Sequence, residues 1–284
     1  MSIVDGKNIA AEIMENSRIK INYLKNKGIF PCIEILLIGN DEGSEKYVQM
    51  KLKKIKEAGA NGNIKKIDES KSDEDIIEII RELNLNRKVN GILVQLPLPD
   101  KFNEENILSE IALEKDIDAL NPITLKKIDQ NNSSYYPAGV DAIMAIFERH
   151  KVTINKKNIT IVGITNLIGR PLASVLRQKG GIVSEIDVGK HLTLDDLIKS
   201  DIIVTDIGKP EWLKKEMVKD QVTIIDAANN YVNGKLLGDV DMNGMINKVN
   251  IITPVPGGVG PILIASLIEN LIKAAEKSFY ADKY

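Results

Sequence analysis

The sequence predicts an α/β protein with two domains, and three observations lead to this prediction. The chain has 284 residues, and because domains commonly hold about 150 residues, two domains are expected. Short apolar runs alternate with segments whose apolar residues recur at helical spacing, which is typical of βα units around a parallel sheet. The second half opens with a strand, a glycine-containing turn and a helix at residues 158–178, as doubly wound sheets of the dinucleotide type do.

In the first half, strands are expected at the apolar runs 32–39 and 91–99. Helices are expected where apolar residues recur every three or four positions, at 46–60 and 73–84. Ser44 is the expected N-cap of the first of these helices, because its hydroxyl can accept a hydrogen bond from a free backbone N–H.

Residues 121–134 are polar and irregular and are interpreted as a linker that closes at Pro137 and Gly139. The second half is then expected to form a doubly wound sheet, with helices at 171–178 and 261–277. Its expected strands are residues 158–163, 182–187, 201–208, 222–228 and 249–255.

Composition and charge exclude several classes of protein. The 38 basic and 40 acidic residues give a net charge of −2, so a basic nucleic-acid-binding surface is not supported. The single cysteine, Cys32, excludes an internal disulfide and a cysteine-based metal cage, and His150 and His191 are far apart in sequence. No metal site is expected. Neither a secretory signal nor a membrane-spanning run is recognisable, so a cytoplasmic protein is expected.

Tyr47 and Lys51 are the first candidate catalytic residues. They lie four residues apart in an expected helix, and therefore on one face of it. A tyrosine hydroxyl beside an ammonium group can orient a water or move a proton if the lysine is partly desolvated. The alternative is a tyrosine that packs against the aliphatic part of a lysine on a solvated face.

Polar side chains at the end of an expected strand form the second group. Gln95 interrupts the apolar run at 91–99 and should lie near the carboxyl end of the strand, where ligands bind in open α/β sheets. Its alternative role is to satisfy neighbouring backbone groups. Asp116 and Asp118 follow in KDIDALNP. One of them could accept hydrogen bonds from an amino-bearing heterocycle, although the motif taken alone favours capping of a local turn.

Two glycine-containing loops form the third group. In TPVPGGVGP, Gly257 and Gly258 can adopt positive φ and allow a ligand to approach the backbone, while the prolines stiffen the loop. The turn GITNLIGRP has glycines six positions apart and is therefore not a G-x-G-x-x-G motif. It can still present backbone amides and a helix N-terminus to phosphates.

In order along the chain, these segments resemble the bifunctional methylenetetrahydrofolate dehydrogenase/methenyltetrahydrofolate cyclohydrolase family, called FolD. The motifs that carry the resemblance are IVDGKNIAAEI, GSEKYVQMKLK, GILVQLPLP, KDIDALNP, GITNLIGRP, GKP, GKLLGDVD and ITPVPGGVGP. The motifs extend over nearly the whole chain, and VQLPLP and PVPGGVGP are the most specific to this family.

The resemblance implies a particular domain organisation. An α/β catalytic domain is expected at residues 1–138, and residues 265–284 are expected to form a helix that returns to it. A Rossmann-like, doubly wound cofactor domain is expected at 139–264, with the folate in the cleft between the domains. The family also implies a cytoplasmic homodimer that uses tetrahydrofolate derivatives and binds neither nucleic acid nor membrane.

The implied activity has two steps in one-carbon metabolism, on the route to purine biosynthesis. 5,10-Methylenetetrahydrofolate is oxidised to 5,10-methenyltetrahydrofolate with a nicotinamide cofactor, and the product is hydrolysed to 10-formyltetrahydrofolate. The family's catalytic lysine falls on Lys51, its ring-contacting tyrosine on Tyr47, its lysine-holding glutamine on Gln95 and its folate-binding aspartate on Asp118. The remaining residues expected to bind the substrate are Leu96, Pro97, Pro256, Gly257 and Gly258.

NADP is the cofactor that the resemblance implies, and NAD is the alternative. The residues expected to bind it are Gly163, Ile164, Thr165, Asn166, Ile168, Gly169, Asp187, Gly208 and Pro210. A carboxylate at the end of the second strand, here Asp187, generally favours the 2′-hydroxyl of NAD. Arg170 or Lys190 could instead provide the positive charge that a 2′-phosphate needs.

The sequence departs from the family pattern mainly on the cofactor side. Ile164 and Thr165 stand where the family often has a basic residue, and Asp206 and Ala228 are further departures. Ala119 ends the motif that the family writes KDVDG. Two alternative functions therefore stay open: a cyclohydrolase with weak or lost dehydrogenase activity, and a non-catalytic dinucleotide-binding protein.

Overall fold

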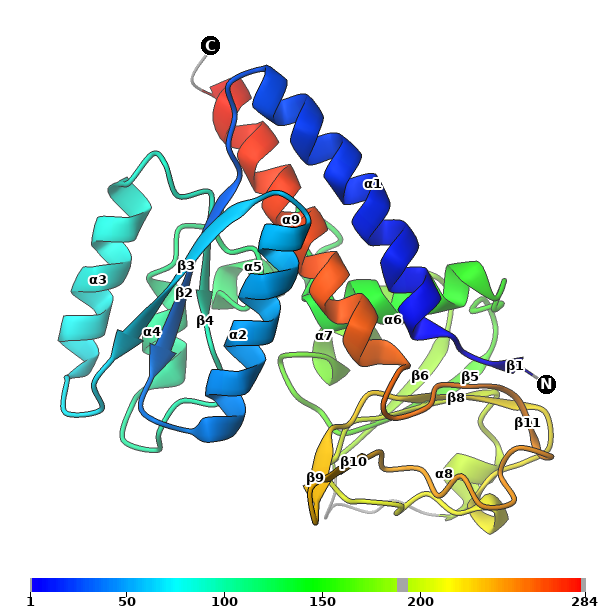
Figure 1. Cartoon of the computed structure of the whole chain (residues 1–284). Coiled ribbons are helices and arrows are strands. Elements are labelled where there is room, and N and C mark those ends of the chain that lie inside the picture. Colours follow the sequence, from blue (N-terminus) through cyan, green and yellow to red (C-terminus); the bar gives the residue numbers. More distant parts are fainter. Residues whose placement is uncertain (1, 188–193, 282–284) are drawn as a thin grey trace. The chain divides into compact units, whose positions relative to one another are not determined.

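The computed structural model describes residues 2–187 and 194–281, and these divide into two compact units (Figure 1). The six-stranded unit holds residues 2–11, 128–132 and 138–263, apart from the undescribed stretch, and the three-stranded unit holds 12–127, 133–137 and 264–281. Lys190 and His191 lie outside the described residues.

The three-stranded unit is built on a parallel sheet of order β3-β2-β4. Its strands are β2 (Cys32–Ile38), β3 (Asn61–Ile67) and β4 (Gly91–Val94). β2 and β4 are apolar apart from Glu34, because both faces of a parallel sheet are covered by other elements. The helices that lie in this unit wholly or in large part are α1 (Gly6–Asn26), α2 (Glu42–Glu57), α3 (Asp73–Leu85), α4 (Glu104–Ser109), α5 (Pro122–Asp129) and α9 (Val259–Ala281).

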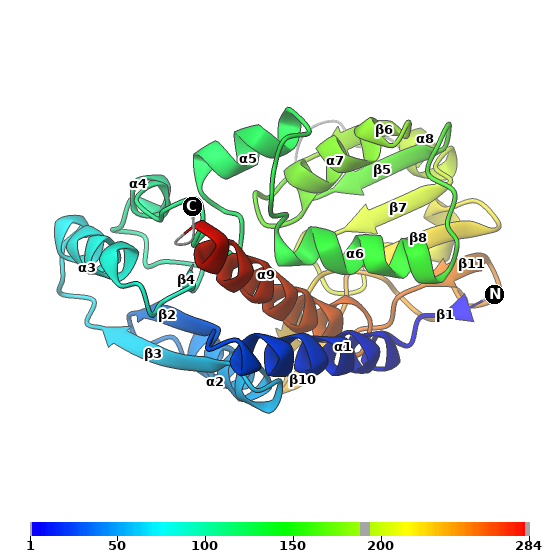
Figure 2. The ribbon, with the colours of Figure 1, turned by 90° about the horizontal axis from the view of Figure 1, so that it is seen from above.

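The C-terminal helix α9 belongs to the three-stranded unit from residue 264 onward, as predicted. It lies beside α1, and Lys20 Nζ is 3.9 Å from a carboxylate oxygen of Glu269 (Figure 2). Most of its length is apolar and buried, with Leu271 and Ala275 among its inaccessible residues. This burial explains why α9, which runs beyond the predicted 261–277, is so long.

The six-stranded unit has the order β1-β11-β8-β7-β5-β6, with every neighbouring pair parallel. The strand order reverses between β5 and β7, which makes the sheet doubly wound as predicted. The strands are β1 (Ser2–Ile3), β5 (Asn158–Val162), β6 (Ile182–Ile186), β7 (Ile202–Thr205), β8 (Val222–Asp226) and β11 (Val249–Ile252). The helical elements are α6 (Ala138–Arg149), α7 (Gly169–Gln178), α8 (Leu194–Ile198) and a 3₁₀ turn, η1 (Lys215–Met217).

Several elements were not predicted. The first is β1, which pairs with β11 and so groups residues 2–11 with the six-stranded unit, whereas the predicted boundary places residues 1–138 together (Figure 2). β3 is a lysine-bearing edge strand whose residues are mostly accessible, a pattern typical of protected sheet edges. The hairpin β9 (Asn230–Val232) and β10 (Lys235–Leu237) is too short to give a periodic signal.

Two local predictions were wrong. The segment interpreted as a linker contains helix α5, in which Ile128 is fully buried. Ser44 is not the N-cap of α2: Asp41 is, because its side chain accepts a hydrogen bond of 2.6 Å from the backbone N–H of Ser44. A serine and an aspartate both suit this position, and the helix begins at the earlier one.

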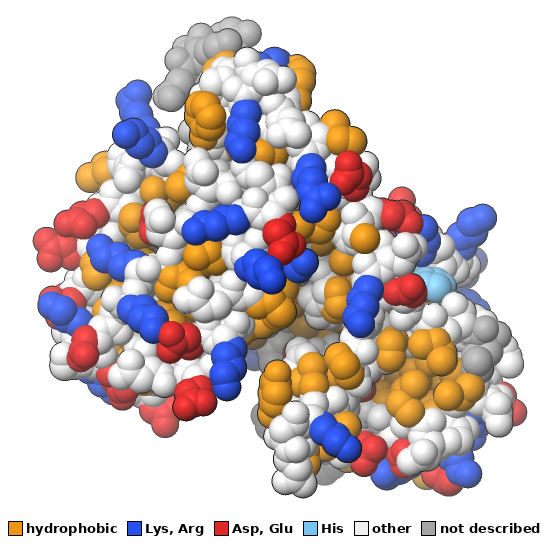
Figure 3. Space-filling view, in the orientation of Figure 1, with side chains coloured by type: hydrophobic (Ala, Val, Ile, Leu, Met, Phe, Trp, Pro, Cys, Tyr) orange, Lys and Arg blue, Asp and Glu red, His pale blue; other side chains and the backbone are white. Residues whose placement is uncertain are grey.

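Positive and negative side chains are interspersed on the face of the molecule in Figure 3, in keeping with the small net charge. Among the described helices, none combines the length and the apolar character that a membrane crossing requires.

Candidate active site

Helix α2 places Tyr47 and Lys51 on one face, one turn apart, as predicted. Lys51 Nζ lies 4.6 Å from the centre of the Tyr47 ring, within the range of a cation–π contact. Lys51 is only 5% exposed, whereas Lys46 and Lys53 on the same helix are exposed. A buried lysine is rare unless it has a partner, so this side chain needs one.

Gln95 is that partner. β4 ends at Val94, which is in register with Leu36 of β2, so Gln95 directly follows the strand. Lys51 Nζ donates a hydrogen bond of 3.0 Å to Gln95 Oε1, and Gln95 Nε2 donates one of 2.6 Å to the carbonyl of Leu96. Both ends of the amide are engaged, so its oxygen is held toward the lysine. The next peptide bond, Leu96–Pro97, is cis.

The loop that carries Asp118 runs beside β4. Asp116 is bridged to Ile92 and is almost inaccessible, and its carboxylate accepts hydrogen bonds from the backbone N–H groups of Leu120 and Asn121 at 3.0 and 3.1 Å. Burial, the main cause, raises the pKa of Asp116 to about 6. Asp116 therefore shapes the loop, as the turn-capping alternative proposed, and Asp118 is left half-buried.

Asp118 interacts electrostatically with Lys51 and Tyr47. Desolvation lowers the pKa of Lys51, and the negative charge of Asp118 opposes that change. Desolvation also raises the pKa of Tyr47, with Asp118 adding to the rise. A lysine whose pKa is lowered can exchange a proton more readily near neutral pH, and the neutral tyrosine hydroxyl remains a hydrogen-bond donor.

Ala119 explains one departure from the family pattern. Its φ is +56°, in the left-handed region that favours glycine, and its side chain is inaccessible. The backbone after Asp118 therefore keeps a conformation suited to glycine although the residue is alanine.

In the six-stranded unit, the turn after β5 is tight enough to demand glycine at two positions. A Cβ at Gly163 would lie 2.2 Å from the carbonyl oxygen of Asp206, and one at Gly169 would lie 2.0 Å from the carbonyl oxygen of Gly163. The turn therefore packs directly against the end of β7, at the reversal of strand order where doubly wound sheets bind ligands.

The N-terminus of α7 suits a phosphate group. Its N-cap is Ile168, which has no side-chain oxygen to cap the helix. The backbone N–H of Ile168 instead donates to Thr165 Oγ1 at 3.2 Å, and Arg170 lies exposed in the first helical turn. In this first turn the N–H of Arg170 donates to the carbonyl of Thr165 at 3.0 Å, and Pro171 has no N–H. The backbone N–H of Gly169, the helix dipole and the Arg170 side chain are therefore what this helix end offers to a phosphate.

The second predicted cofactor loop, with Gly208 and Pro210, is held by a residue that sequence reasoning did not assign. Asp239 is inaccessible, and its carboxylate accepts hydrogen bonds from the backbone N–H groups of Ile207 at 2.8 Å and Lys209 at 2.9 Å. Thr205 Oγ1 and Asn230 Nδ2 also donate to it. Asp239 lies in the motif GKLLGDVD, which could have drawn attention to it, but the motif does not indicate which residues its carboxylate contacts.

Two further carboxyl groups follow strands of the six-stranded sheet: Asp206 follows β7, directly before this loop, and Asp187 follows the edge strand β6. Burial, aided by the charge of Asp239, raises the pKa of Asp206 to about 6, while a long contact of 3.5 Å from Thr165 Oγ1 opposes the change. Asp187, directly after β6, is exposed. The cofactor side thus carries more negative charge than a phosphate site normally does.

The predicted substrate residues Pro256, Gly257 and Gly258 lie in the six-stranded unit. They pack against the N-terminal motif: a Cβ at Gly6 would lie 1.9 Å from the carbonyl oxygen of Gly258. Gly257 has φ of +107°, and the Val255–Pro256 peptide bond is cis. Leu96 and Pro97 lie in the three-stranded unit with Tyr47, Lys51, Gln95 and Asp118.

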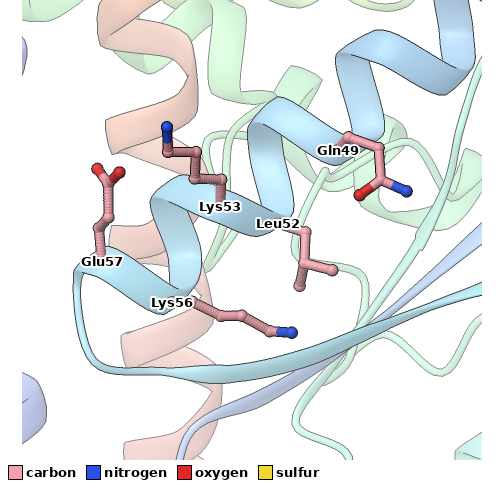
Figure 4. A pocket seen from close by; sticks show the side chains of 5 residues that line it. All are labelled: Gln49, Leu52, Lys53, Lys56 and Glu57. Carbon is pink, nitrogen blue, oxygen red and sulfur yellow. The ribbon is translucent and has the colours of Figure 1, made fainter.

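A surface pocket of about 530 Å³ on α2 does not involve these residues (Figure 4). It is lined by Gln49, Leu52, Lys53, Lys56 and Glu57. The charged side chains in it are exposed. Lys53 and Glu57 point to one side and Lys56 to another, so the three converge on no common ligand position.

Comparisons with known proteins agree with the resemblance. Residues 4–118 match the model of the tetrahydrofolate dehydrogenase/cyclohydrolase catalytic domain, and residues 137–279 match that of the NAD(P)-binding domain of the same enzymes. A bifunctional protein FolD from Campylobacter hominis is 37% identical over 97% of this chain and 98% of its own.

Two solved structures are similar over nearly the whole chain. The bifunctional FolD of Campylobacter jejuni has a TM-score of 0.95 at 34% identity, covering 98% of this chain and 99% of its own. The Trypanosoma brucei FolD, complexed with NADP cofactor and inhibitor, has a TM-score of 0.93 at 27% identity, covering 98% of each chain. This chain therefore belongs to the tetrahydrofolate dehydrogenase/cyclohydrolase family.

Proposed function

We propose that this chain oxidises 5,10-methylenetetrahydrofolate to 5,10-methenyltetrahydrofolate with a nicotinamide cofactor, and then hydrolyses the product to 10-formyltetrahydrofolate. The observation that carries the proposal is the buried hydrogen bond from Lys51 to Gln95, beside Tyr47 and the charge of Asp118. In a family of folate enzymes, such a desolvated amine beside an aromatic ring suits chemistry on a flat heterocycle.

A bound nicotinamide cofactor would supply the hydride acceptor for the first step, in which the one-carbon bridge of the substrate is oxidised. The chain's own residues serve by positioning, because hydride transfer needs alignment and a dry site rather than an acid or base. Asp118 accepts hydrogen bonds from N–H groups of the pterin, and Tyr47 packs along the ring. Leu96 and Pro97 complete the substrate-binding set in the three-stranded unit.

In the second step, water adds to the cationic methenyl carbon and loses a proton. The bond from that carbon to N5 then breaks as N5 gains a proton and the new hydroxyl group loses its own, which leaves the formyl group on N10 and releases one proton overall. Lys51 moves the proton, because its lowered pKa allows the amine to accept and return it. Gln95 holds the amine in place through the 3.0 Å hydrogen bond.

NADP is our first candidate for the cofactor, and NAD is the second. The turn 163–169, the N-terminus of α7 and the loop with Gly208 and Pro210 are the residues that hold it. Arg170 supports NADP through its positive charge, whereas Asp187 supports NAD because a carboxylate repels a 2′-phosphate. We also propose that the protein works in the cytoplasm as a homodimer.

The test is to follow methenyl absorbance in the purified protein with NADP, with NAD and without cofactor. We expect methenyl formation with one of the two cofactors and methenyl hydrolysis without either. Lys51→Met should lower hydrolysis at least about 100-fold, since a positioned general acid or base contributes a factor of that order. Hydrolysis at the wild-type rate in this variant would contradict the role of Lys51, and absence of both activities in the wild type would contradict the proposed function.

A further inference from the structure

One polar side chain of α9 is fully buried at a position where the helix is otherwise apolar. Asn270 is 0% exposed, and its neighbours Leu267, Leu271 and Ala274 form part of the core. Burying an amide costs free energy unless each of its polar atoms finds a partner. The partners of Asn270 therefore indicate why the helix carries it.

Both N–H groups of the Asn270 amide donate to the backbone of distant segments. Nδ2 lies 3.0 Å from the carbonyl oxygen of Ile117 and 2.9 Å from that of Tyr136. Oδ1 accepts a hydrogen bond of 3.1 Å from Lys273 Nζ. The amide is thus fully engaged, and its orientation is fixed because only the nitrogen can face two carbonyl groups.

The carbonyl of Ile117 belongs to the peptide unit that leads directly into Asp118. The same loop is held at Glu114, whose carbonyl accepts a hydrogen bond of 3.1 Å from the hydroxyl of Tyr135. Lys115 Nζ anchors it further by donating to the carbonyls of Leu83, Asn84 and Asn86 at the end of α3. Of these three side chains, Asn270 holds the residue nearest to the half-buried carboxylate, because Ile117 directly precedes Asp118.

We propose that Asn270 is a positioning residue for the folate substrate: it fixes the peptide before Asp118 and thereby aims that carboxylate at the pterin. This inference rests on the proposed function, in which Asp118 binds the pterin N–H groups. It assigns to α9 a role in substrate affinity beyond closing the core of the three-stranded unit.

A purely structural role for Asn270 makes a different prediction. An amide that only satisfies two carbonyls would affect stability, and its effect on substrate binding would not depend on Asp118. A residue that acts through Asp118 loses its effect on binding once the carboxylate is removed. A double-mutant cycle separates the two cases.

The experiment measures the dissociation constant of tetrahydrofolate by calorimetry in the full-length protein. Asn270→Leu keeps the side-chain volume but removes both donors, and Asn270→Ser keeps one donor. Each is made alone and with Asp118→Ala, and Ser266→Ala, also buried and one turn earlier on α9, is the matched control. Thermal unfolding of every variant shows whether it is folded.

We expect Asn270→Leu to weaken tetrahydrofolate binding about tenfold, the usual order for loss of a buried hydrogen bond, and Asn270→Ser to weaken it less. In the Asp118→Ala background, either change should alter binding less than about twofold. If Asn270→Leu does not fold, the serine variant carries the comparison. Ser266→Ala should bind as the wild type does.

An equal loss of affinity in both backgrounds, or unchanged affinity in Asn270→Leu, would overturn the inference while leaving the proposed function intact. A wild-type protein that neither binds tetrahydrofolate nor acts on its one-carbon derivatives would instead overturn the proposed function itself.

Discussion

The two units form their candidate sites in different ways. In the three-stranded unit, side chains make the site: Lys51, Gln95, Tyr47 and Asp118 interact with one another at the end of β4. In the six-stranded unit, backbone makes it: Gly163 and Gly169 allow a turn that no side chain would fit, and Asp239 holds a loop through its N–H groups. The first arrangement suits proton transfer to a small part of a heterocycle, and the second suits an elongated, phosphate-bearing ligand.

The largest effect that would test this difference is expected from Gly169→Ala. The new Cβ would lie 2.0 Å from the carbonyl oxygen of Gly163, so the turn must move. We expect dinucleotide affinity, measured by calorimetry, to fall at least about 100-fold because the phosphate site is built from this backbone. Methenyl hydrolysis should persist. Gly260→Ala is the control, since nothing lies within 4 Å of a Cβ there; equal loss of both activities in Gly169→Ala would contradict the separation of roles.

A smaller effect is expected from Asp239→Asn. The amide keeps the shape of the side chain but places an NH₂ group among donors, so the loop with Gly208 and Pro210 should loosen. We expect the KM for the dinucleotide to rise about tenfold, as for loss of a charge-assisted hydrogen bond. The KM for methenyltetrahydrofolate in hydrolysis should not change. A changed KM for methenyltetrahydrofolate with an unchanged KM for the dinucleotide would contradict the assignment of Asp239 to the cofactor loop.

The two sites should also respond to pH with opposite signs. In the folded chain the pKa of Asp206 is raised to about 6, so at pH 7 the buried carboxyl group is ionised and lowers the free energy of unfolding. This cost disappears below about pH 4, where the carboxyl group is protonated in both the folded and the unfolded chain. Asp206→Asn should therefore raise the free energy of unfolding at pH 7 by about 2 kcal/mol and by much less at pH 4.

Burial lowers the pKa of Lys51 in the folded chain, so the cost of charging this amine is full below that lowered pKa and disappears as pH rises toward the ordinary lysine value. Lys51→Met should stabilise the chain at pH 7 and lose that advantage in alkaline solution. Urea unfolding at pH 4, 7 and 9.5 checks both variants. A stabilisation of Asp206→Asn that grows on acidification would contradict the sign.

The smallest effect concerns two buried alanines of the three-stranded unit. Ala119 has φ of +56° and Ala58 has φ of −73°, and both are inaccessible. Replacement by glycine removes one buried methyl group from each, but relieves backbone strain only at Ala119. Ala119→Gly should therefore be more stable than Ala58→Gly by about 1 kcal/mol in urea unfolding. Equal stabilities would show that the left-handed backbone costs little here.

The sequence predicted those parts of the fold that leave a local signal. Predominantly apolar runs revealed β2, β4, β5, β7, β8 and β11, because both faces of such strands are covered. The strand β3 and helix α5 were missed because their residues are mostly polar, and only tertiary contacts explain their regular structure.

The same contrast holds for the site. Local patterns made Tyr47 and Lys51 on one helix and Gln95 at a strand end candidates, and the family resemblance assigned their catalytic roles, which stay a prediction. Asn270 was not predicted, because it contacts Ile117 across 153 residues and only the fold brings them together. A single amide side chain within an apolar helix was the available signal, but it does not indicate which distant residues the amide contacts.

The interleaved path of the chain limits how the molecule can be divided. Ser2 and Ile3 pair with a strand that ends at Ile252, and the loop before Asp118 depends on an amide at residue 270. Neither unit is therefore encoded by one uninterrupted stretch of the gene. A fragment cut at the predicted boundary near residue 138 would lack α9 on one side and the edge strand β1 on the other. During synthesis, Ser2 and Ile3 can pair only after Ile252 has been made, and the loop before Asp118 gains its contact only after Asn270 has been made. Neither unit can therefore be completed until most of the chain has been synthesised.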